Sequence, residues 1–255
     1  MPQQPITPVP AFIWLAIIAA MQACSPMPKA HRPLLKPEAA ALKEARSLVP
    51  KKAKEAYVLL MTSQGNMVLK LYNQTPLHRN NFLAKTQQGF YDSLLFHRVI
   101  NNFMIQGGDP TSKTATAGQM LGSGSAPGER IPAEFRTEQG IYHKRGALAA
   151  ARDQNPEKAS SNCQFYIVHR KPWRPGELDS MARMRNLTLN EAQRNLYTTT
   201  GGTPHLDGNY TVYGELVKGF DILDSIAATP TQPGDRPKTD VRFTILLLHK
   251  PKKLP

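Results

Sequence analysis

The stretch FHRVINNFMIQGGDP, Phe96–Pro110, places one arginine, Arg98, among apolar residues and then runs through a Phe-Met pair and a glutamine into two glycines. Apolar runs that end in glycine are typical of a strand followed by a turn. A permanent cation inside such a run indicates either an ion pair in the core or chemistry at a functional site. The surrounding sequence distinguishes the two.

Strand-like runs flank this stretch on both sides. Residues 57–72, YVLLMTSQGNMVLKLY, predict a hairpin about a Gln-Gly-Asn turn, with Met67, Leu69 and Leu71 on one face. Further strand-like runs are LLFHRVI (94–100), FMIQGG (103–108), GALAAA (146–151), CQFYIVH (163–169), YTVYGELV (210–217) and VRFTILLLH (241–249).

Two segments have helical signals instead. In residues 75–89, Thr75 is placed as N-cap, Pro76 as the first helical residue and Gly89 as the stop. Residues 219–227, GFDILDSIA, have apolar side chains at helical spacing. Many short strands with two helices favour a mainly β fold, a closed antiparallel eight-stranded β-barrel capped by two α-helices, over a parallel α/β sheet.

One segment lies outside this pattern. Residues 171–203 are rich in arginine and helix-prone after Ser180, and they lie between two strands, so we interpret them as a helical insertion. The folded domain is expected to span residues 55–250. A basic tail, 251–255, follows it.

The chain begins with an apolar run, Ala11–Ala23, that ends at Cys24. The run is short for a membrane span of about 20 residues but suits a signal peptide over residues 1–23. Small residues before a cysteine resemble the lipoprotein type, in which Cys24 is acylated and anchors the protein to the membrane, facing the periplasm or cell surface. A secretory signal that is simply cleaved, a retained anchor and a cytosolic apolar segment are the alternatives.

Positive charge is concentrated outside the central domain. The net charge is +13, of which Ser25–Lys54 carries +6 (eight Lys/Arg, two Glu), Arg170–Arg194 +3 (six against three) and the last three lysines +3. This distribution argues against a nucleic-acid groove in the fold and favours a basic, Pro/Ala-rich tether over residues 24–54, with one helical stretch near 37–48. Lysines that merely keep a linker solvated are the alternative.

The stretch FHRVINNFMIQGGD resembles the central motif of cyclophilins, the peptidyl-prolyl cis/trans isomerases. The segments GALAAAR, SSNCQFYIV and HLDGNYTVYGELVKGFDILDSIA follow in the family's order. The resemblance implies a cyclophilin-like barrel that accelerates Xaa-Pro rotation without a covalent intermediate, and the signal-like start adds the expectation that its clients are exported proteins. It also implies no cofactor, a monomer, and proline-containing polypeptides as substrates.

The resemblance also implies roles for individual residues. Arg98 matches the catalytic arginine, and Gln106 matches the glutamine that orients it and meets the substrate backbone. The residues that match the proline pocket and peptide groove are Phe103, Met104, Ala151, Arg152, Gln164, Tyr166, His205, Leu206 and Tyr210. His205 replaces a common tryptophan, Tyr210 a common histidine and Tyr166 the pocket phenylalanine, whose added hydroxyl needs a partner or water. We assign His97 a structural role, with backbone hydrogen bonds to its ring.

No residues show metal-ligand spacing, and the two cysteines suggest no disulfide framework. The alternative to an enzyme is a chaperone or scaffold that binds proline-containing segments with little turnover, in which the insertion recruits a partner. Nucleic-acid binding through the basic ends is a third possibility, which predicts steep salt dependence.

Overall fold

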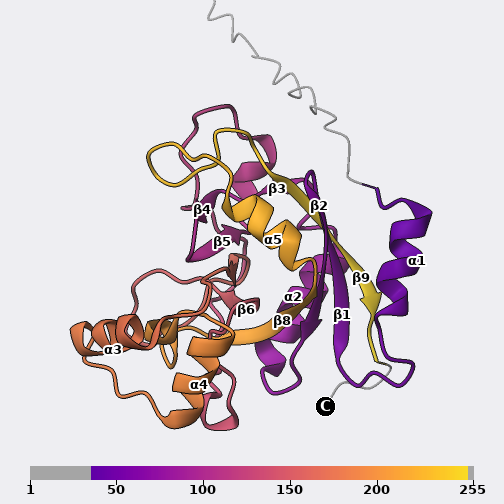
Figure 1. The fold of residues 1–255 in the computed structure, drawn as a ribbon. Coiled ribbons are helices and arrows are strands. Elements are labelled where there is room, and N and C mark those ends of the chain that lie inside the picture. The colour runs from indigo at the N-terminus through magenta and orange to yellow at the C-terminus, as the bar shows by residue number, and fades with distance from the viewer. Residues whose placement is uncertain (1–35, 252–255) are drawn as a thin grey trace, which may run out of the picture. The chain divides into compact units, whose positions relative to one another are not determined.

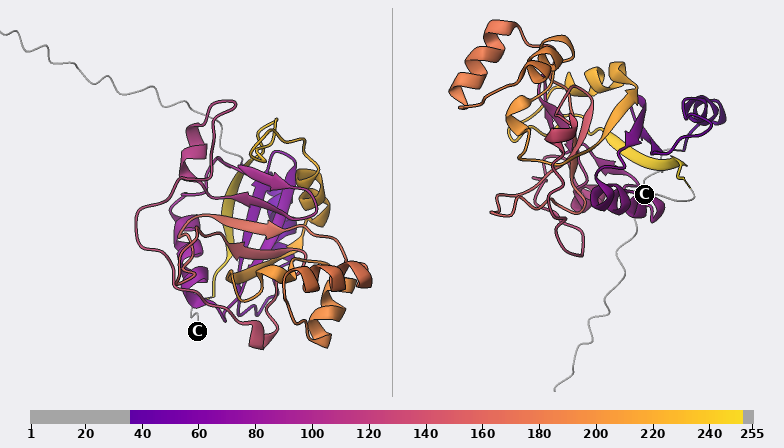
Figure 2. Two further views of the ribbon diagram at one scale, coloured as in Figure 1. Left: turned by 90° about the vertical axis from the view of Figure 1, so that its left-hand side faces the viewer. Right: turned by 90° about the horizontal axis from the view of Figure 1, so that it is seen from below.

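Nine strands form one antiparallel sheet in the computed structural model, which describes residues 36–251. The strand order is β3-β9-β1-β2-β8-β6-β7-β5-β4, and the sheet curls into an open half-barrel (Figures 1 and 2). The strands are β1 (Ala56–Thr62), β2 (Gly65–Leu71), β3 (Leu94–Leu95), β4 (Arg98–Ile100), β5 (Met104–Gly107), β6 (Ala147–Ala150), β7 (Phe165–Val168), β8 (Val212–Lys218) and β9 (Arg242–His249).

The prediction of a closed eight-stranded barrel is wrong at one place, the run 94–100. This run was predicted as one strand, but it forms β3 and β4, which lie at opposite edges of the sheet. β3 pairs with β9 and β4 pairs with β5, so the ladder is interrupted at Phe96 and His97. The nine strands therefore form an open half-barrel with two short edges.

Successive side chains along each strand point to opposite faces of the sheet, one facing the inner core and the other the outer face. The inner core contains Ile105 of β5 and Val99 of β4, together with a group of aromatic rings that includes Phe82, Phe165 and Phe243. Met104 packs on the outer face, in a second apolar cluster with Tyr166. In the β4–β5 register Arg98 pairs with Gln106 and Ile100 with Met104, so alternation along each strand places Arg98 on the outer face with Met104.

Five α-helices lie in the described part of the chain: α1 (Ala39–Ser47), α2 (Pro76–Gln87), α3 (Pro175–Met184), α4 (Glu191–Thr199) and α5 (Phe220–Ala227). α2 and α5, the two predicted capping helices, bury side chains in the same inner core. α1 lies beside β1 and β9 and buries Ala45 against the outward residues of those strands (Figure 1). The helical stretch predicted in the tether is therefore packed on the sheet.

The insertion forms α3 and α4, which lie together away from α1 (Figure 1). They share a small apolar cluster in which Leu178, Met181 and Tyr197 are buried. Asn190 and Gln193 make a capping box at the start of α4. Its own core and caps give the insertion a defined structure.

Candidate active site

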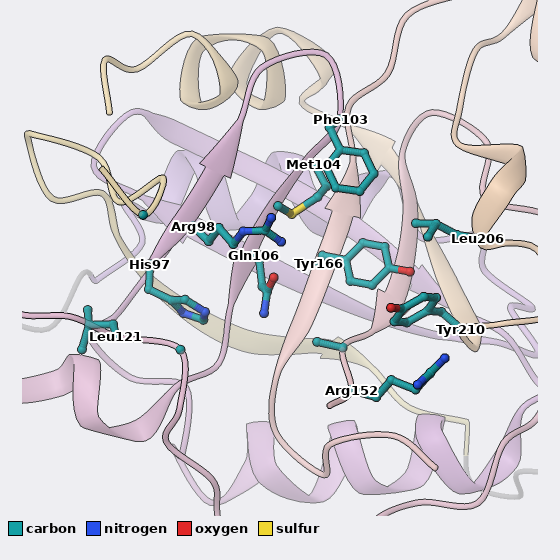
Figure 3. Close-up of a pocket in the computed structure, with 13 residues that line it drawn as sticks. His97, Arg98, Phe103, Met104, Gln106, Leu121, Arg152, Tyr166, Leu206 and Tyr210 are labelled. Atoms are coloured by element: carbon teal, nitrogen blue, oxygen red, sulfur yellow. The ribbon is translucent and has the colours of Figure 1, made fainter. Parts of the chain in front are cut away.

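A cavity of about 320 Å³ opens on the outer face of the sheet, at the low end of the size range of ligand pockets (Figure 3). β4, β5 and β7 supply its floor, and the segments after β6 and before β8 supply one side. Its lining residues are His97, Arg98, Phe103, Met104, Gln106, Leu121, Gly122, Ala151, Arg152, Tyr166, Leu206, Tyr210 and Gly234.

Nine of the eleven substrate-contacting residues predicted from the sequence therefore meet at one cavity. Gln164 and His205 are the two that do not line it. Gln164 lies in an adjoining cavity and is hydrogen bonded to Gln106. His205 lies behind Phe103, with the two rings stacked at a centroid distance of 5.9 Å.

Arg98 reaches the pocket from β4 and is held by an acidic partner. Its Nε donates to Oδ2 of Asp235 at 3.2 Å, and its two terminal NH₂ groups donate to no other residue in 36–251. The main chain of Asp235 is fixed as well, because its carbonyl accepts from the Val99 amide of β4 at 2.8 Å. Donors that cannot be titrated away therefore stay free to face a bound molecule.

Gln106 stands opposite Arg98 in the β4–β5 register, but it does not hold the guanidinium in this structure. Its Nε2 donates to Oε1 of Gln164 at 3.1 Å. Gln164 in turn donates to the carbonyls of Gly122 and Gly124. The orienting partner of Arg98, predicted to be Gln106, is Asp235, and the glutamines instead fasten the loop at residues 122–124.

The second glycine of the stretch 96–110, Gly108, is required by the backbone conformation and by close packing. Gly108 has φ +98°, and a Cβ there would lie 2.2 Å from the carbonyl oxygen of Cys163. Only glycine combines this backbone conformation with such a close approach. β5 can therefore leave the sheet directly beside the segment that carries Gln164.

Apolar side chains form the opposite wall of the pocket. Met104 and Tyr166 are buried on neighbouring strands, and Phe103, Leu206 and Tyr210 pack against them. In Figure 3 these side chains lie around one hollow that Arg98 and Gln106 enter from the other side. The arrangement suits a small apolar ring next to a polar backbone.

Arg152 fixes the rim of the pocket through two contacts. Its guanidinium stacks over the Tyr210 ring at 4.6 Å, and its Nε donates to the Asn209 carbonyl at 3.0 Å. This contact holds Tyr210 edge-on to Tyr166, with a centroid distance of 6.0 Å.

Sequence reasoning missed four lining residues: His97, Leu121, Gly122 and Gly234. His97 was assigned backbone hydrogen bonds, but neither ring nitrogen has a hydrogen-bond partner in the described structure, although its side chain is buried. Burial lowers the pKa of His97 to about 4, an effect to which the nearby Arg98 adds and which Asp109 opposes. The ring is therefore neutral at pH 7. Its position directly before Arg98 was the only available signal.

Cys24 lies outside the described residues. Within 36–251 no three histidine, cysteine, aspartate or glutamate side chains are placed to hold a metal ion. Cys163 is buried, and burial raises the pKa of its thiol.

Three comparisons with known proteins give one result. Residues 57–246 match the family model described as cyclophilin type peptidyl-prolyl cis-trans isomerase/CLD. A protein of Streptococcus pyogenes serotype M6, named as a bifunctional phosphatase/peptidyl-prolyl cis-trans isomerase, is 38% identical over 189 residues, covering 72% of this chain but only 37% of its own length. A Staphylococcus saprophyticus protein named as a peptidyl-prolyl cis-trans isomerase is 36% identical and is covered over 88% of its length, against 73% of this chain.

Among solved structures, the fold is similar to a Cryptosporidium parvum cyclophilin type peptidyl-prolyl cis-trans isomerase, with a TM-score of 0.57 and 24% identity, over 77% of this chain and 99% of that one. A second structure of the same protein, solved in the presence of the dipeptide Ala-Pro, gives a TM-score of 0.56.

Proposed function

Because the chain belongs to the cyclophilin-type peptidyl-prolyl cis-trans isomerase family, we propose that it accelerates Xaa-Pro rotation at the pocket beside Arg98. Amide resonance gives this rotation a barrier of about 18–20 kcal/mol. The reaction makes and breaks no covalent bond. The protein needs only to bind the twisted amide more tightly than the planar one.

The apolar wall seats the proline ring. Phe103, Met104 and Leu206 supply surfaces against which the ring packs, and Tyr166 closes the floor. Burial raises the pKa of Tyr166 well above its usual range, so its hydroxyl stays neutral and adds no charge to this wall. A seated ring leaves the preceding residue as the part of the substrate that turns.

Arg98 supplies the donor that the twisted amide requires. When resonance is lost the prolyl nitrogen becomes pyramidal and its lone pair, delocalised in the planar amide, is localised on nitrogen, where it accepts a hydrogen bond. The free NH₂ groups of Arg98 face the pocket while Nε is bonded to Asp235. Gln106 and the fastened loop at Gly122 are positioned to meet the substrate backbone. The observation that carries the proposal is this pairing of a held cation with an apolar ring seat.

Arg98→Ala tests the proposal with an Ala-Pro peptide and the full chain. We expect kcat/KM to fall about 100-fold or more, the size of effect seen when one preorganised donor is removed. Arg46→Ala, an exposed arginine on α1, a helix that supplies no residue to the pocket, is the matched control and should keep the activity. Equal rates for the Arg98 variant and the unchanged protein would refute the proposal.

We also propose an extracytoplasmic location, with Cys24 acylated, exported proteins as clients and the monomer as the working form. The apolar run that ends at Cys24 and the basic segment after it support this location. In the described part of the chain, no helix has the length and apolar character needed to cross a membrane. Mass spectrometry of the mature N-terminus tests the anchor: an unmodified Cys24, or a chain that still begins at Met1, would overturn it.

A further inference from the structure

The hydroxyl of the pocket residue Tyr166 is bound from behind the pocket wall. It lies 3.0 Å from Nε2 of His143, whose side chain is 1% exposed, and the two rings are stacked with an interplanar angle of 14°. Tyr166 is thus attached to a residue outside the cavity. His143 has no place in the isomerase chemistry.

His143 is held in turn by Asp207, the residue directly after Leu206. Oδ1 of Asp207 accepts from both the backbone amide and Nδ1 of His143, each at 2.9 Å. A carboxylate can only accept, so Nδ1 carries a hydrogen, and in the tautomer with that single ring hydrogen Nε2 is an acceptor. The Tyr166 hydroxyl therefore donates to His143, and only its lone pairs remain for the pocket side.

The other oxygen of Asp207 is bonded to the insertion. Oδ2 accepts from the Tyr197 hydroxyl at 2.6 Å and from Nε2 of Gln193 at 3.1 Å, both on α4. Tyr197 is fully buried, and burial together with the Asp207 charge raises its pKa, so it remains a donor. Gln193 also closes the capping box with Asn190, so its amide is held in place by the helix end itself.

We propose that the insertion 171–203 is a working part of the proline pocket, in which Tyr197 and Gln193 act as positioning residues for Tyr166 through Asp207 and His143. The inference rests on the isomerase function proposed above. Four donor groups meet the Asp207 carboxylate, which is 7% exposed at its side chain. Removing one of these donors leaves the buried Asp207 carboxylate with one hydrogen bond fewer. The carboxylate then moves toward another donor or lets a water molecule in to replace the lost one.

A movement of the Asp207 carboxylate would reach the pocket at two lining residues. Asp207 follows Leu206 in the chain, and His143 fixes the Tyr166 hydroxyl, so one carboxylate fixes two of the residues that seat the ring. A surface loop that is merely tolerated has no such connection. The geometry thus explains why this chain carries tyrosine, not phenylalanine, at position 166.

A double-mutant cycle with the full chain tests the connection. Tyr197→Phe removes one hydroxyl and keeps the ring, and we expect kcat/KM for an Ala-Pro peptide to fall about two- to tenfold, the effect of one hydrogen bond. In a Tyr166→Phe background the same change should cost clearly less than in the unchanged background, because only the connection through Leu206 then reaches the pocket. An equal loss in both backgrounds, or no loss in the unchanged background, would overturn the proposal.

Two further variants serve as a substitute, in case Tyr197→Phe does not fold, and as a matched control. Gln193→Glu keeps the acceptor that Asn190 needs and places a second carboxylate where Asp207 now has a donor. The position is half-exposed, so this variant replaces Tyr197→Phe if that one does not fold, and it should lower kcat/KM at least as much. Tyr142→Phe, in the same apolar cluster but outside the relay, is the matched control and should keep full activity. A loss in Tyr142→Phe as large as in Tyr197→Phe would contradict a specific relay.

A readout that does not need activity separates this proposal from the isomerase function. The ¹⁵N shifts of the His143 ring should report a hydrogen on Nδ1 and a bare Nε2 at pH 7, and both should move in Tyr197→Phe. If the protein turns over no Xaa-Pro peptide while these shifts behave as expected, the proposed function fails and the relay stands. Ring shifts that stay unchanged in Tyr197→Phe would remove the relay even in an active enzyme.

Discussion

Asp235 is expected to tune the activity of Arg98 by orienting it, and two substitutions separate orientation from charge. Asp235→Ala removes both the acceptor of the Arg98 Nε hydrogen and the countercharge. Asp235→Asn keeps an acceptor oxygen in the same place and removes only the charge. Both variants keep the carbonyl that accepts from Val99, but Asp235 has φ 65°, a backbone conformation that asparagine adopts as aspartate does and alanine less readily, so unfolding in urea is needed as a control for the Ala variant.

The structure limits the size of the effect. The two side chains are 43% and 42% exposed and share one hydrogen bond of 3.2 Å, so the pair belongs with exposed ion pairs. Such pairs contribute about 0.2–1 kcal/mol, which corresponds to a loss in kcat/KM of at most about fivefold. We expect Asp235→Ala to lose about two- to fivefold and Asp235→Asn less than about twofold.

The assay is isomerisation of an Ala-Pro peptide, followed at low and at about 0.5 M salt, with unfolding in urea as a stability control. Orientation by a hydrogen bond predicts that the Asn variant ranks close to the unchanged protein at both salt concentrations. A loss in Asp235→Asn as large as in Asp235→Ala would show that charge matters instead. Unchanged activity in both variants would refute the reasoning.

Two further predictions concern stability. Glu134→Ala should lower the free energy of unfolding in urea at pH 7 by about 3 kcal/mol. The carboxylate is 4% exposed and caps α2, because it accepts from the Leu77 amide and from the amide and Nδ1 of His78. Glu157→Ala, at an exposed position, is the control, and an equal loss of stability in both variants would contradict the role of Glu134 as a cap. His97, with its pKa lowered from 6.5 to about 4, binds a proton more readily when unfolded, so its contribution is complete above pH 6.5 and is lost as the pH falls toward 4. Between pH 7.5 and 5 we expect the free energy of unfolding to fall by about 2 kcal/mol through His97. This fall should be absent in His97→Phe, and an unchanged pH dependence in His97→Phe would exclude His97 as the cause.

The sequence predicted those parts of the fold that depend on local patterns. Alternation identified the β1–β2 hairpin, and the cap and stop residues placed α2 within two residues of its observed end. Local periodicity decides these features, so no distant contact was needed to find them.

Features that depend on distant partners could not be predicted. The run 94–100 reads as one strand, and only its pairing with β9 on one side and β5 on the other splits it. Thr75 occupies the N-cap position of α2, but its hydroxyl caps nothing and Glu134, far along the chain, accepts from the first turn instead. Asp235 likewise meets Arg98 across 137 residues of sequence.

The two short edges of the half-barrel bear on how copies of this chain meet one another. An exposed edge strand offers unpaired amides and carbonyls to any other strand, which is a common route to aggregation. Here the Leu95 amide of β3 donates to Ser112 Oγ, and the Val99 amide of β4 donates to the Asp235 carbonyl. The loop that orients Arg98 therefore also occupies an amide that the β4 edge would otherwise offer to a strand of another copy.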